Sequence, residues 1–144
     1  MRGLHEPGAY RDLASNPGTN DAVLRALADC QYPFVWHALA ANPRTPADVL
    51  TRLCMQRDNT WNDNRLLLLI AWHPHADRDV LLAVLSRLKA LLTIGESRPY
   101  AAVLALATRA GITPEDVQAL ALLPGASARM RRGLRRRIAE RGEA

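Results

Sequence analysis

The chain has 144 residues, of which 49% are hydrophobic and 23% charged, a composition typical of one folded domain and not of a disordered chain. No apolar run approaches the roughly 18 residues that a membrane-spanning helix needs, and the N-terminus lacks the apolar core of a secretory signal. Because Cys30 and Cys54 alone cannot form a disulfide framework, we expect a single cytoplasmic domain over residues 1–144 without a membrane span.

One pattern recurs along the chain. The line Leu-Ala-Ser-Asn-Pro-Gly-Thr at 13–19 returns at 39–45 as Leu-Ala-Ala-Asn-Pro-Arg-Thr, in looser form at 70–76, and with one extra residue at 106–113. Apolar residues at helical spacing follow each copy. Self-similarity of this kind indicates stacked repeats, each of which is too small to bury its own apolar face.

In chain order, the pattern predicts four helical repeats and a last, basic helix. Each repeat consists of two short helices that end and begin around the recurring line. The repeats are expected near 9–29, 34–56, 63–93 and 99–123, with helices near 9–14, 20–29, 34–41, 46–56, 63–72, 77–93, 99–109 and 114–122, and the basic capping helix near 127–141.

The turn inside each repeat combines a helix stop with a helix start. Asn-Pro ends the first helix because proline excludes its predecessor from the α region. Thr45 and Thr113 are predicted N-caps of the next helix, each followed by a proline at the first helical position, and Asp77 is the candidate cap in the third copy. The Leu-Ala pairs, such as Leu39 and Ala40, are expected where neighbouring repeats touch.

The line Leu-Ala-x-Asn-Pro-x-Thr-Pro-x-x-Val-Leu-x-x-Leu, best met at 39–53, resembles the leucine-rich repeat variant family. The resemblance covers residues 9–123 and implies a right-handed solenoid in which α-helices alternate with 3₁₀ helices, without β-strands. The best-known members carry a cysteine-rich iron–sulfur segment, whereas this chain has only Cys30 and Cys54, so no redox cofactor is implied. We therefore expect an all-α, right-handed superhelical solenoid of about four short repeats with a C-terminal capping helix.

The three tryptophans stand in different settings. Trp36 occupies a slot that holds an aromatic residue in the first copy as well, which predicts a core position. Trp72 stands where the other copies have small residues, so it is expected to be partly exposed. Trp61 lies in the polar segment 55–64, which is predicted to be an exposed loop, and repeat proteins often place binding specificity on such loops.

These observations define a candidate protein-binding patch on one face of the molecule. Its members are Trp61 and Trp72, joined by His37 and His73. Tryptophan is enriched among the residues that dominate binding energy at interfaces. The alternative is that the four side chains have separate packing roles.

The sequence His73-Pro74-His75 is a candidate metal site that His37 or Asp77 would have to complete. Zinc sites use three or four protein ligands, usually at cysteine-based or helical spacings, and this tripeptide has neither. His73 instead takes the slot that Asn42 holds in the second copy, where a polar residue ends a helix. We expect the turn, and no metal or other cofactor.

Motifs of known enzyme classes are absent from the sequence. No serine lies in a G-x-S-x-G turn, and the sole lysine, Lys89, does not follow a phosphate-binding glycine-rich loop. The paired carboxylates Glu115 and Asp116 lie in a predicted first helical turn, where the helix dipole explains them. The sequence therefore predicts a protein that is not an enzyme.

The net charge of +5 comes from residues 125–144, in a chain whose strong preference for arginine is typical of a GC-rich, for instance bacterial, genome. Met130, Leu134 and Ile138 follow each other at i, i+4 and i+8, which predicts a helix with one narrow apolar stripe that closes the repeat array. The alternative is that its cations bind nucleic-acid phosphates, an acidic partner or an anionic membrane surface. The candidate contacts are Arg131, Arg132, Arg135 and Arg136.

The sequence as a whole favours a non-enzymatic interaction module or scaffold with another protein as its partner. The alternative function is a nucleic-acid-associated protein that binds through the arginine-rich helix. The repeat pattern does not identify the partner.

Overall fold

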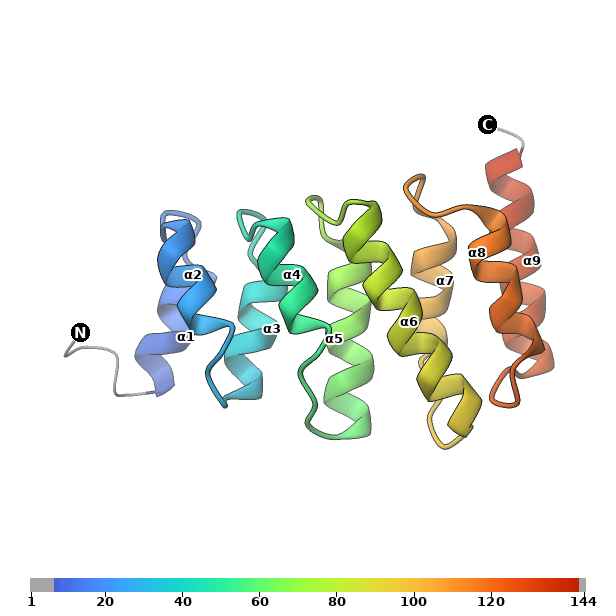
Figure 1. Cartoon of the computed structure of the whole chain (residues 1–144), viewed down its shortest axis with the longest axis horizontal. Helices are drawn as coiled ribbons and strands as arrows, with labels where there is room; N and C mark the ends of the chain where they lie inside the picture. Colours follow the sequence, from blue (N-terminus) through green and yellow to red (C-terminus); the bar gives the residue numbers. More distant parts are fainter. Residues whose placement is uncertain (1–6, 143–144) are drawn as a thin grey trace.

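The computed structural model describes residues 7–142, and every regular element in that range is a helix (Figure 1). The α-helices are α1 (Pro7–Ser15), α2 (Asp21–Leu27), α3 (Pro33–Ala41), α4 (Ala47–Leu53), α5 (Thr60–Trp72), α6 (Arg78–Ile94), α7 (Tyr100–Ala107), α8 (Pro114–Gln118) and α9 (Ala128–Gly142). A 3₁₀ segment, η2 (Ala119–Leu122), continues α8. The all-α prediction is confirmed, and each expected helix is present with its ends shifted by only a few residues.

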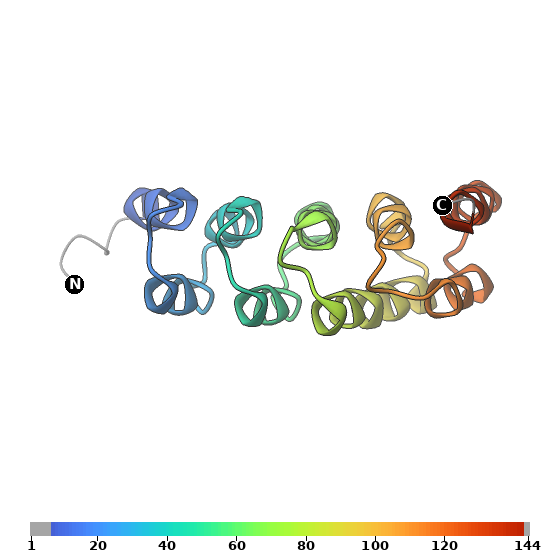
Figure 2. The ribbon, with the colours of Figure 1, turned by 90° about the horizontal axis from the view of Figure 1, so that it is seen from above.

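The helices form two rows, which Figure 2 shows from above. The first row consists of α1, α3, α5, α7 and α9, and the second of α2, α4, α6 and α8 with η2. Successive helices of the first row pack on one another, and in the second row α6 packs on both α4 and η2. We call the consecutive pairs α1–α2, α3–α4, α5–α6 and α7–α8 units; contacts between elements run mainly between neighbours, as in repeat proteins.

Two local expectations are wrong. The resemblance implied 3₁₀ helices in alternation, but in the described range α2, α4 and α6 are α-helical and the 3₁₀ conformation is confined to η2. The segment 55–64 is not a loop throughout, because α5 begins at Thr60. The Asn59 side chain accepts a hydrogen bond from the backbone N–H of Asn62 and caps the helix, so Trp61 lies in the first helical turn.

Two of the three predicted N-caps are confirmed. The Thr113 side chain accepts from the N–H of Asp116, whose carboxylate accepts from the N–H of Thr113, and together they form a capping box. The Asp77 side chain accepts from the N–H of Val80 and caps α6. Both caps satisfy backbone donors that the first turn of a helix leaves without partners.

Thr45 is not a cap, which corrects the prediction. Its side chain is fully buried, and its hydroxyl donates to the carbonyl oxygen of Leu39 at 2.7 Å, while Pro46 takes the N-cap position of α4. Thr19 makes the equivalent bond to the carbonyl of Leu13, also at 2.7 Å. The threonine of the recurring line therefore closes the preceding helix in these two copies, because that helix ends in carbonyls without intrahelical partners.

The small residue of each Leu-Ala pair lies in the core, as expected. Ala14, Ala40, Ala71 and Ala107 are all buried, with at most 3% of their surface exposed. They lie on the first-row helices that pack directly on one another. A methyl group at this position lets adjacent helices approach closely.

Polar side chains at the helix ends join each unit to the one before it. The Asn42 amide donates to the carbonyls of Ala14 and Asn16, at 2.9 and 3.2 Å. In the next unit, Nε2 of His73 lies 2.7 Å from the carbonyl oxygen of Asn42. Both side chains are buried, so their hydrogen bonds satisfy groups that water does not reach.

Arginines continue the series. Arg109 donates to the carbonyls of Ala71 and His73, at 2.7 and 3.1 Å. Arg141 of α9 donates to the carbonyls of Ala107 and Ile112, at 3.2 and 2.7 Å. We call Asn42, His73, Arg109 and Arg141 the interunit ladder, which satisfies helix-terminal carbonyls across each junction.

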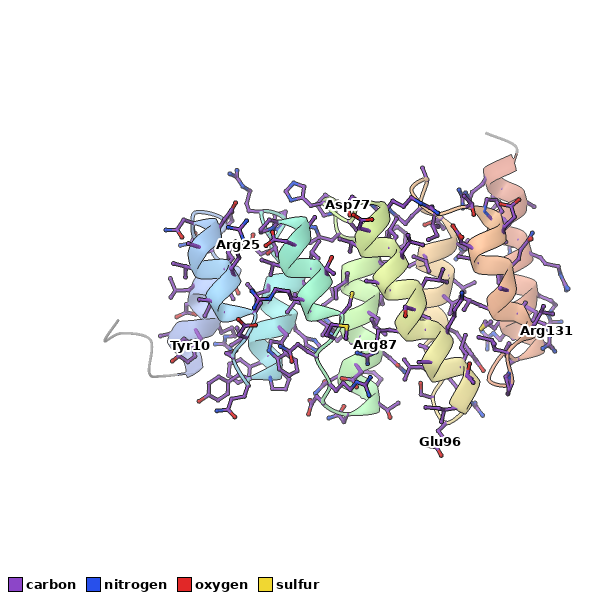
Figure 3. All side chains as sticks on the ribbon, viewed as in Figure 1. Tyr10, Arg25, Asp77, Arg87, Glu96 and Arg131 are labelled. Atoms are coloured by element: carbon purple, nitrogen blue, oxygen red, sulfur yellow. The ribbon has the colours of Figure 1, made fainter. Side chains whose placement is uncertain are left out.

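The opposite ends of the helices carry a shorter set of such bonds. Gln56 donates to the carbonyl of Ala28 at 2.8 Å, and Arg87 donates to that of Cys54 at 2.6 Å. Figure 3 shows Arg87 extending from α6 toward the preceding unit. Arg87 also lies 4.0 Å from the carboxylate of Asp63, which compensates part of the cost of burying its charge.

Candidate protein-interaction surface

One face of α5 carries an exposed aromatic stripe. Trp61, Arg65, Leu68 and Trp72 follow each other at i, i+4, i+7 and i+11, so they share one side of the helix. Trp61 is 76% exposed and Trp72 57%, as the sequence predicted for both. Asp63, which contacts Arg87 of α6, lies on the opposite side of the helix, so the stripe points away from the second row.

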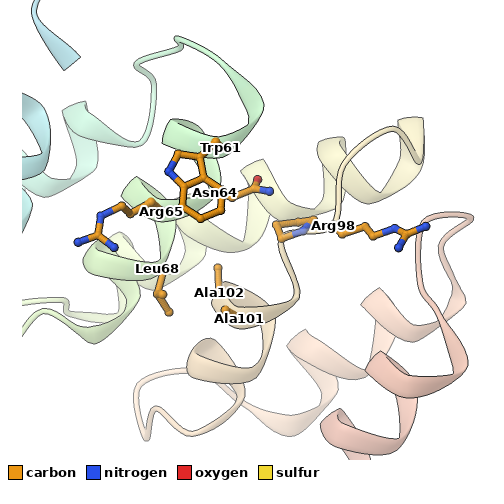
Figure 4. A pocket seen from close by; sticks show the side chains of 8 residues that line it. Trp61, Asn64, Arg65, Leu68, Arg98, Ala101 and Ala102 are labelled. Atoms are coloured by element: carbon orange, nitrogen blue, oxygen red, sulfur yellow. The ribbon is translucent and has the colours of Figure 1, made fainter. Parts of the chain in front are cut away.

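A hollow lies between this stripe and α7 (Figure 4). It encloses about 320 Å³ between Trp61, Arg65 and Leu68 on one side and Arg98 on the other. The remaining residues that line it are Asn64, Pro99, Ala101 and Ala102. From α7 the hollow is lined by Ala101 and Ala102, whose short side chains leave space between the two helices.

A second hollow of about 520 Å³ continues the first toward α9. The two share Leu68 and Ala101, so they form one groove that we call the α5–α7 groove. The second part is lined by Leu68, Trp72, Ala101, Leu104, Ala105, Thr108, Arg137 and Glu140. The groove thus runs along the exposed side of α5 from one tryptophan to the other.

The other side of Trp61 faces α3. A hollow of about 290 Å³ is lined by Pro33, Phe34 and His37 of α3 and by Trp61, Asn62 and Arg65 of α5. His37 and Trp61 are therefore brought together, as the candidate patch required. Phe34, 42% exposed, belongs to the same surface and was missed, because α3 is apolar on nearly all sides and its pattern does not reveal the outward face.

His73 does not belong to this surface, which corrects the predicted patch. Its side chain is 3% exposed, its Nε2 faces the carbonyl of Asn42, and its Nδ1 accepts a hydrogen bond from the N–H of His75 at 2.9 Å. Burial lowers the pKa of His73 and outweighs the hydrogen bond to Asn42, which raises it; the neighbouring His75 and Arg109 lower it further. The residue ends α5 and joins two units, as the turn interpretation expected.

The remaining tryptophan and the cysteines lie inside the molecule. Trp36 is buried, as predicted, and its indole N–H donates to the carbonyl of Cys30 at 2.8 Å. Cys54 is fully buried, and burial raises the pKa of its thiol to about 12. Within residues 7–142, no three His, Cys, Asp or Glu side chains lie together in a way that could hold a metal ion.

The groove has a local excess of positive charge. Arg65, Arg98 and Arg137 line it, and its one carboxylate, Glu140, lies 3.3 Å from Arg136. Many of the acidic side chains lie elsewhere, in the first turns of the second-row helices, where they complement the helix dipoles. These are Asp21 of α2, Asp48 of α4, Asp79 of α6, and Glu115 and Asp116 of α8.

Helix α9 packs as the sequence predicted. Met130 and Leu134 are each 1% exposed, and Ile138 packs against the same core. Among the four candidate arginines, Arg131 donates to the carbonyl of Ala126 at 3.0 Å and Arg136 pairs with Glu140. Arg132 and Arg135 are exposed to solvent.

Comparison with known proteins adds no identification: no family model, curated protein or solved structure matches this chain. In the described part of the chain, no helix has both the length and the apolar character needed to cross a membrane.

Proposed function

We propose that this chain is a non-enzymatic, cytoplasmic protein-interaction module that binds its partner on the exposed side of α3, α5 and α7. In this proposal the two rows of helices form a right-handed solenoid of four repeats, closed by α9 as a cap. The interunit ladder supports this architecture, because Asn42, His73 and Arg109 hold the same position in three copies of the recurring line and each bonds a carbonyl of the preceding unit. Membership of the leucine-rich repeat variant family stays a prediction.

The observation that carries the proposal is the pair of exposed tryptophans beside a groove. Trp61 and Trp72 are 76% and 57% exposed, on the same side of one helix, and hollows adjoin both. Contiguous exposed apolar surface next to a cleft marks interaction sites, and tryptophan often dominates their binding energy. A helix row presents such residues from a rigid scaffold.

An affinity capture experiment tests the proposal. Tagged wild-type chain and a Trp61→Ala, Trp72→Ala variant are incubated with nuclease-treated lysate of the source organism. A control chain carries Ile94→Ala and Leu122→Ala, which remove two other exposed apolar side chains, 66% and 87% exposed. Proteins retained by the wild-type and control chains but not by the tryptophan variant support the proposal; identical sets in all three contradict it.

The alternative function, nucleic-acid binding, has one observation in its favour. Arg132 and Arg135 are exposed on the last helix, where a phosphate backbone would reach them. If they bind phosphates, replacing both with Gln should make the dependence of log Kd on log salt shallower by about 1.8 on duplex DNA. Capture that nuclease abolishes would favour this alternative.

A further inference from the structure

We propose that the α5–α7 groove binds an acidic amphipathic segment of another protein. Its apolar side chains would lie between Trp61 and Trp72, and its carboxylates would contact Arg65, Arg98 and Arg137. This inference rests on the proposed protein-interaction function and adds the chemistry of the partner.

The dimensions of the groove fit a short helix. Trp61 and Trp72 lie eleven residues apart on α5, a distance of roughly 16 Å, which three turns of a second helix would match. Three of the residues that line the groove from α7 are Ala101, Ala102 and Ala105, whose short side chains leave room for large ones from a partner. An amphipathic helix laid in such a groove inserts side chains at i, i+3 or i+4, and i+7.

The charge of the groove selects among such segments. In the part of the chain that the structure describes, Arg65, Arg98 and Arg137 take part in no ion pair, whereas Glu140 is paired with Arg136. The Arg65 and Arg98 guanidinium groups extend to opposite sides of the hollow (Figure 4), so carboxylates at the rim of the groove would meet them. Guanidinium binds carboxylate in a two-pronged geometry. A basic segment would meet these three like charges, with Glu140 as the one carboxylate that lines the groove.

A nucleic-acid strand fits the groove less well. Proteins that bind single strands align a continuous cationic track with aromatic rings on which successive bases stack. Here the two tryptophans lie roughly 16 Å apart with an apolar floor between them. The arrangement of charge around a non-polar centre is that of a protein interface.

A random peptide library displayed on phage tests the proposal. We expect the full-length wild-type chain to enrich peptides in which Asp and Glu alternate with Leu, Phe or Trp at helical spacing. Enrichment should fall at least about tenfold for the Trp61→Ala, Trp72→Ala variant, as truncation of an anchor that contributes more than 1.4 kcal/mol implies. Circular dichroism and the melting temperature confirm that each variant is folded.

Charge reversal makes the test specific. A chain with Arg65→Glu, Arg98→Glu and Arg137→Glu should switch its preference to basic amphipathic peptides. A matched control changes the total charge equally, at residues outside the groove, and should keep the acidic preference. It carries Lys89→Glu, Arg132→Glu and Arg135→Glu, all at exposed positions on α6 and α9.

Each other result overturns the proposal. Neutral or basic peptides enriched by the wild-type chain, or a preference that reverses equally in the control, would show that the groove does not select carboxylates. No enrichment at all would also overturn it, and so would a mixed-sequence single-stranded oligonucleotide whose binding depends on Trp61 and Trp72. The tryptophan-dependent capture of proteins tests the interaction function separately, so it can succeed where the acidic segment fails.

Discussion

His73 lies where the second and third units meet, and both of its ring nitrogens are in use. Because Nδ1 accepts from the N–H of His75, the ring proton is on Nε2, which donates to the carbonyl of Asn42. Protonation would remove the acceptor and add a positive charge near Arg109. Burial accordingly lowers the pKa of His73, and the folded chain holds the ring neutral.

The stability of the wild-type chain should therefore fall as the pH drops below 6.5, the ordinary pKa of histidine. In this range the unfolded chain binds a proton at His73 that the folded chain excludes, so acid favours the unfolded state. His73→Asn, which restores the residue found at Asn42, should fold, cost about 1 kcal/mol near pH 8, and lose this part of the pH dependence. Urea unfolding of both chains at about pH 8 and about pH 5 measures the cost of the substitution and the change of stability with pH.

The comparison isolates the ring at position 73. His37, whose pKa burial also lowers, is present in both chains, so its contribution cancels in the difference. Parallel pH profiles for the wild-type and His73→Asn chains would show that this histidine is not the group responsible.

Gly125 lies against the backbone of Leu92, where there is no room for a side chain. Its N–H donates to the carbonyl of Leu92 at 2.7 Å, and its own carbonyl accepts from the Tyr100 hydroxyl at 2.7 Å. A Cβ at this position would lie 2.7 Å from the Leu92 oxygen. Gly125→Ala should therefore destabilise the fold by roughly 1–3 kcal/mol in urea unfolding, because backbone must move.

Gly8→Ala provides the control for this effect, since nothing lies within 4 Å of a Cβ there. Gly8 is in α1, where alanine is preferred over glycine by up to about 1 kcal/mol. Equal losses at the two glycines would mean that the contact with Leu92 is not what excludes a side chain.

The positions of the helices could be predicted from local signals in the sequence, but the role of one threonine of the recurring line could not. Thr45 and Thr113 are each followed by a proline and, three residues on, by an aspartate, yet only Thr113 caps a helix. The difference is tertiary: Thr45 is fully buried and reaches back to the carbonyl of Leu39, whereas Thr113 is exposed. The spacing of residues in the sequence does not indicate whether a threonine hydroxyl will bond the N–H of the following helix or the carbonyl of the preceding one.

Only some residues of the candidate surface could be predicted from the sequence. The exposure of Trp72 could be predicted because Trp72 replaces small residues of other copies, which a comparison of the copies within the sequence reveals. Phe34 was missed because all faces of α3 are apolar, so no periodic contrast exists. The assignment of His73 to the patch was wrong, although its predicted place in the turn was right. A polar residue at a junction between units can be buried when both of its hydrogen-bonding groups find partners.

Adjacent positions on α3 test the packing of neighbouring helices. Ala40 is 3% exposed, whereas Ala41 lies on the exposed side of the same helix. Ala40→Leu should overpack the helix contact and cost roughly 1–3 kcal/mol, while Ala41→Leu should stay within about 0.5 kcal/mol of wild type. Chemical denaturation of the two variants measures the contrast. Equal costs at these neighbours would mean that the two faces of α3 are assigned wrongly.

At the scale of the whole molecule, stability depends on a chain of contacts between neighbours. Each first-row helix contacts the next, from α1 through to α9, and few contacts link distant units. Helix α9 packs on α7, buries Met130 and Leu134, and presents arginines to solvent. In a stack of this kind, loss of a terminal helix exposes the apolar face of its neighbour and leaves distant units in contact with their own partners.

Disruption of α9 should therefore destabilise the molecule from that end. Met130→Ser and Leu134→Ser remove two side chains that are each 1% exposed, and each should cost roughly 2–5 kcal/mol. Hydrogen exchange should show the largest loss of protection in α7 and α9, with smaller losses toward α1. Arg132→Gln and Arg135→Gln, on the exposed side of the same helix, should change neither stability nor exchange by a measurable amount. A stack in which contacts run mainly between neighbours transmits a terminal defect with decreasing effect, so protection should fall less with distance from α9. An equal fall in every helix would contradict this expectation and show that the units unfold as one cooperative body.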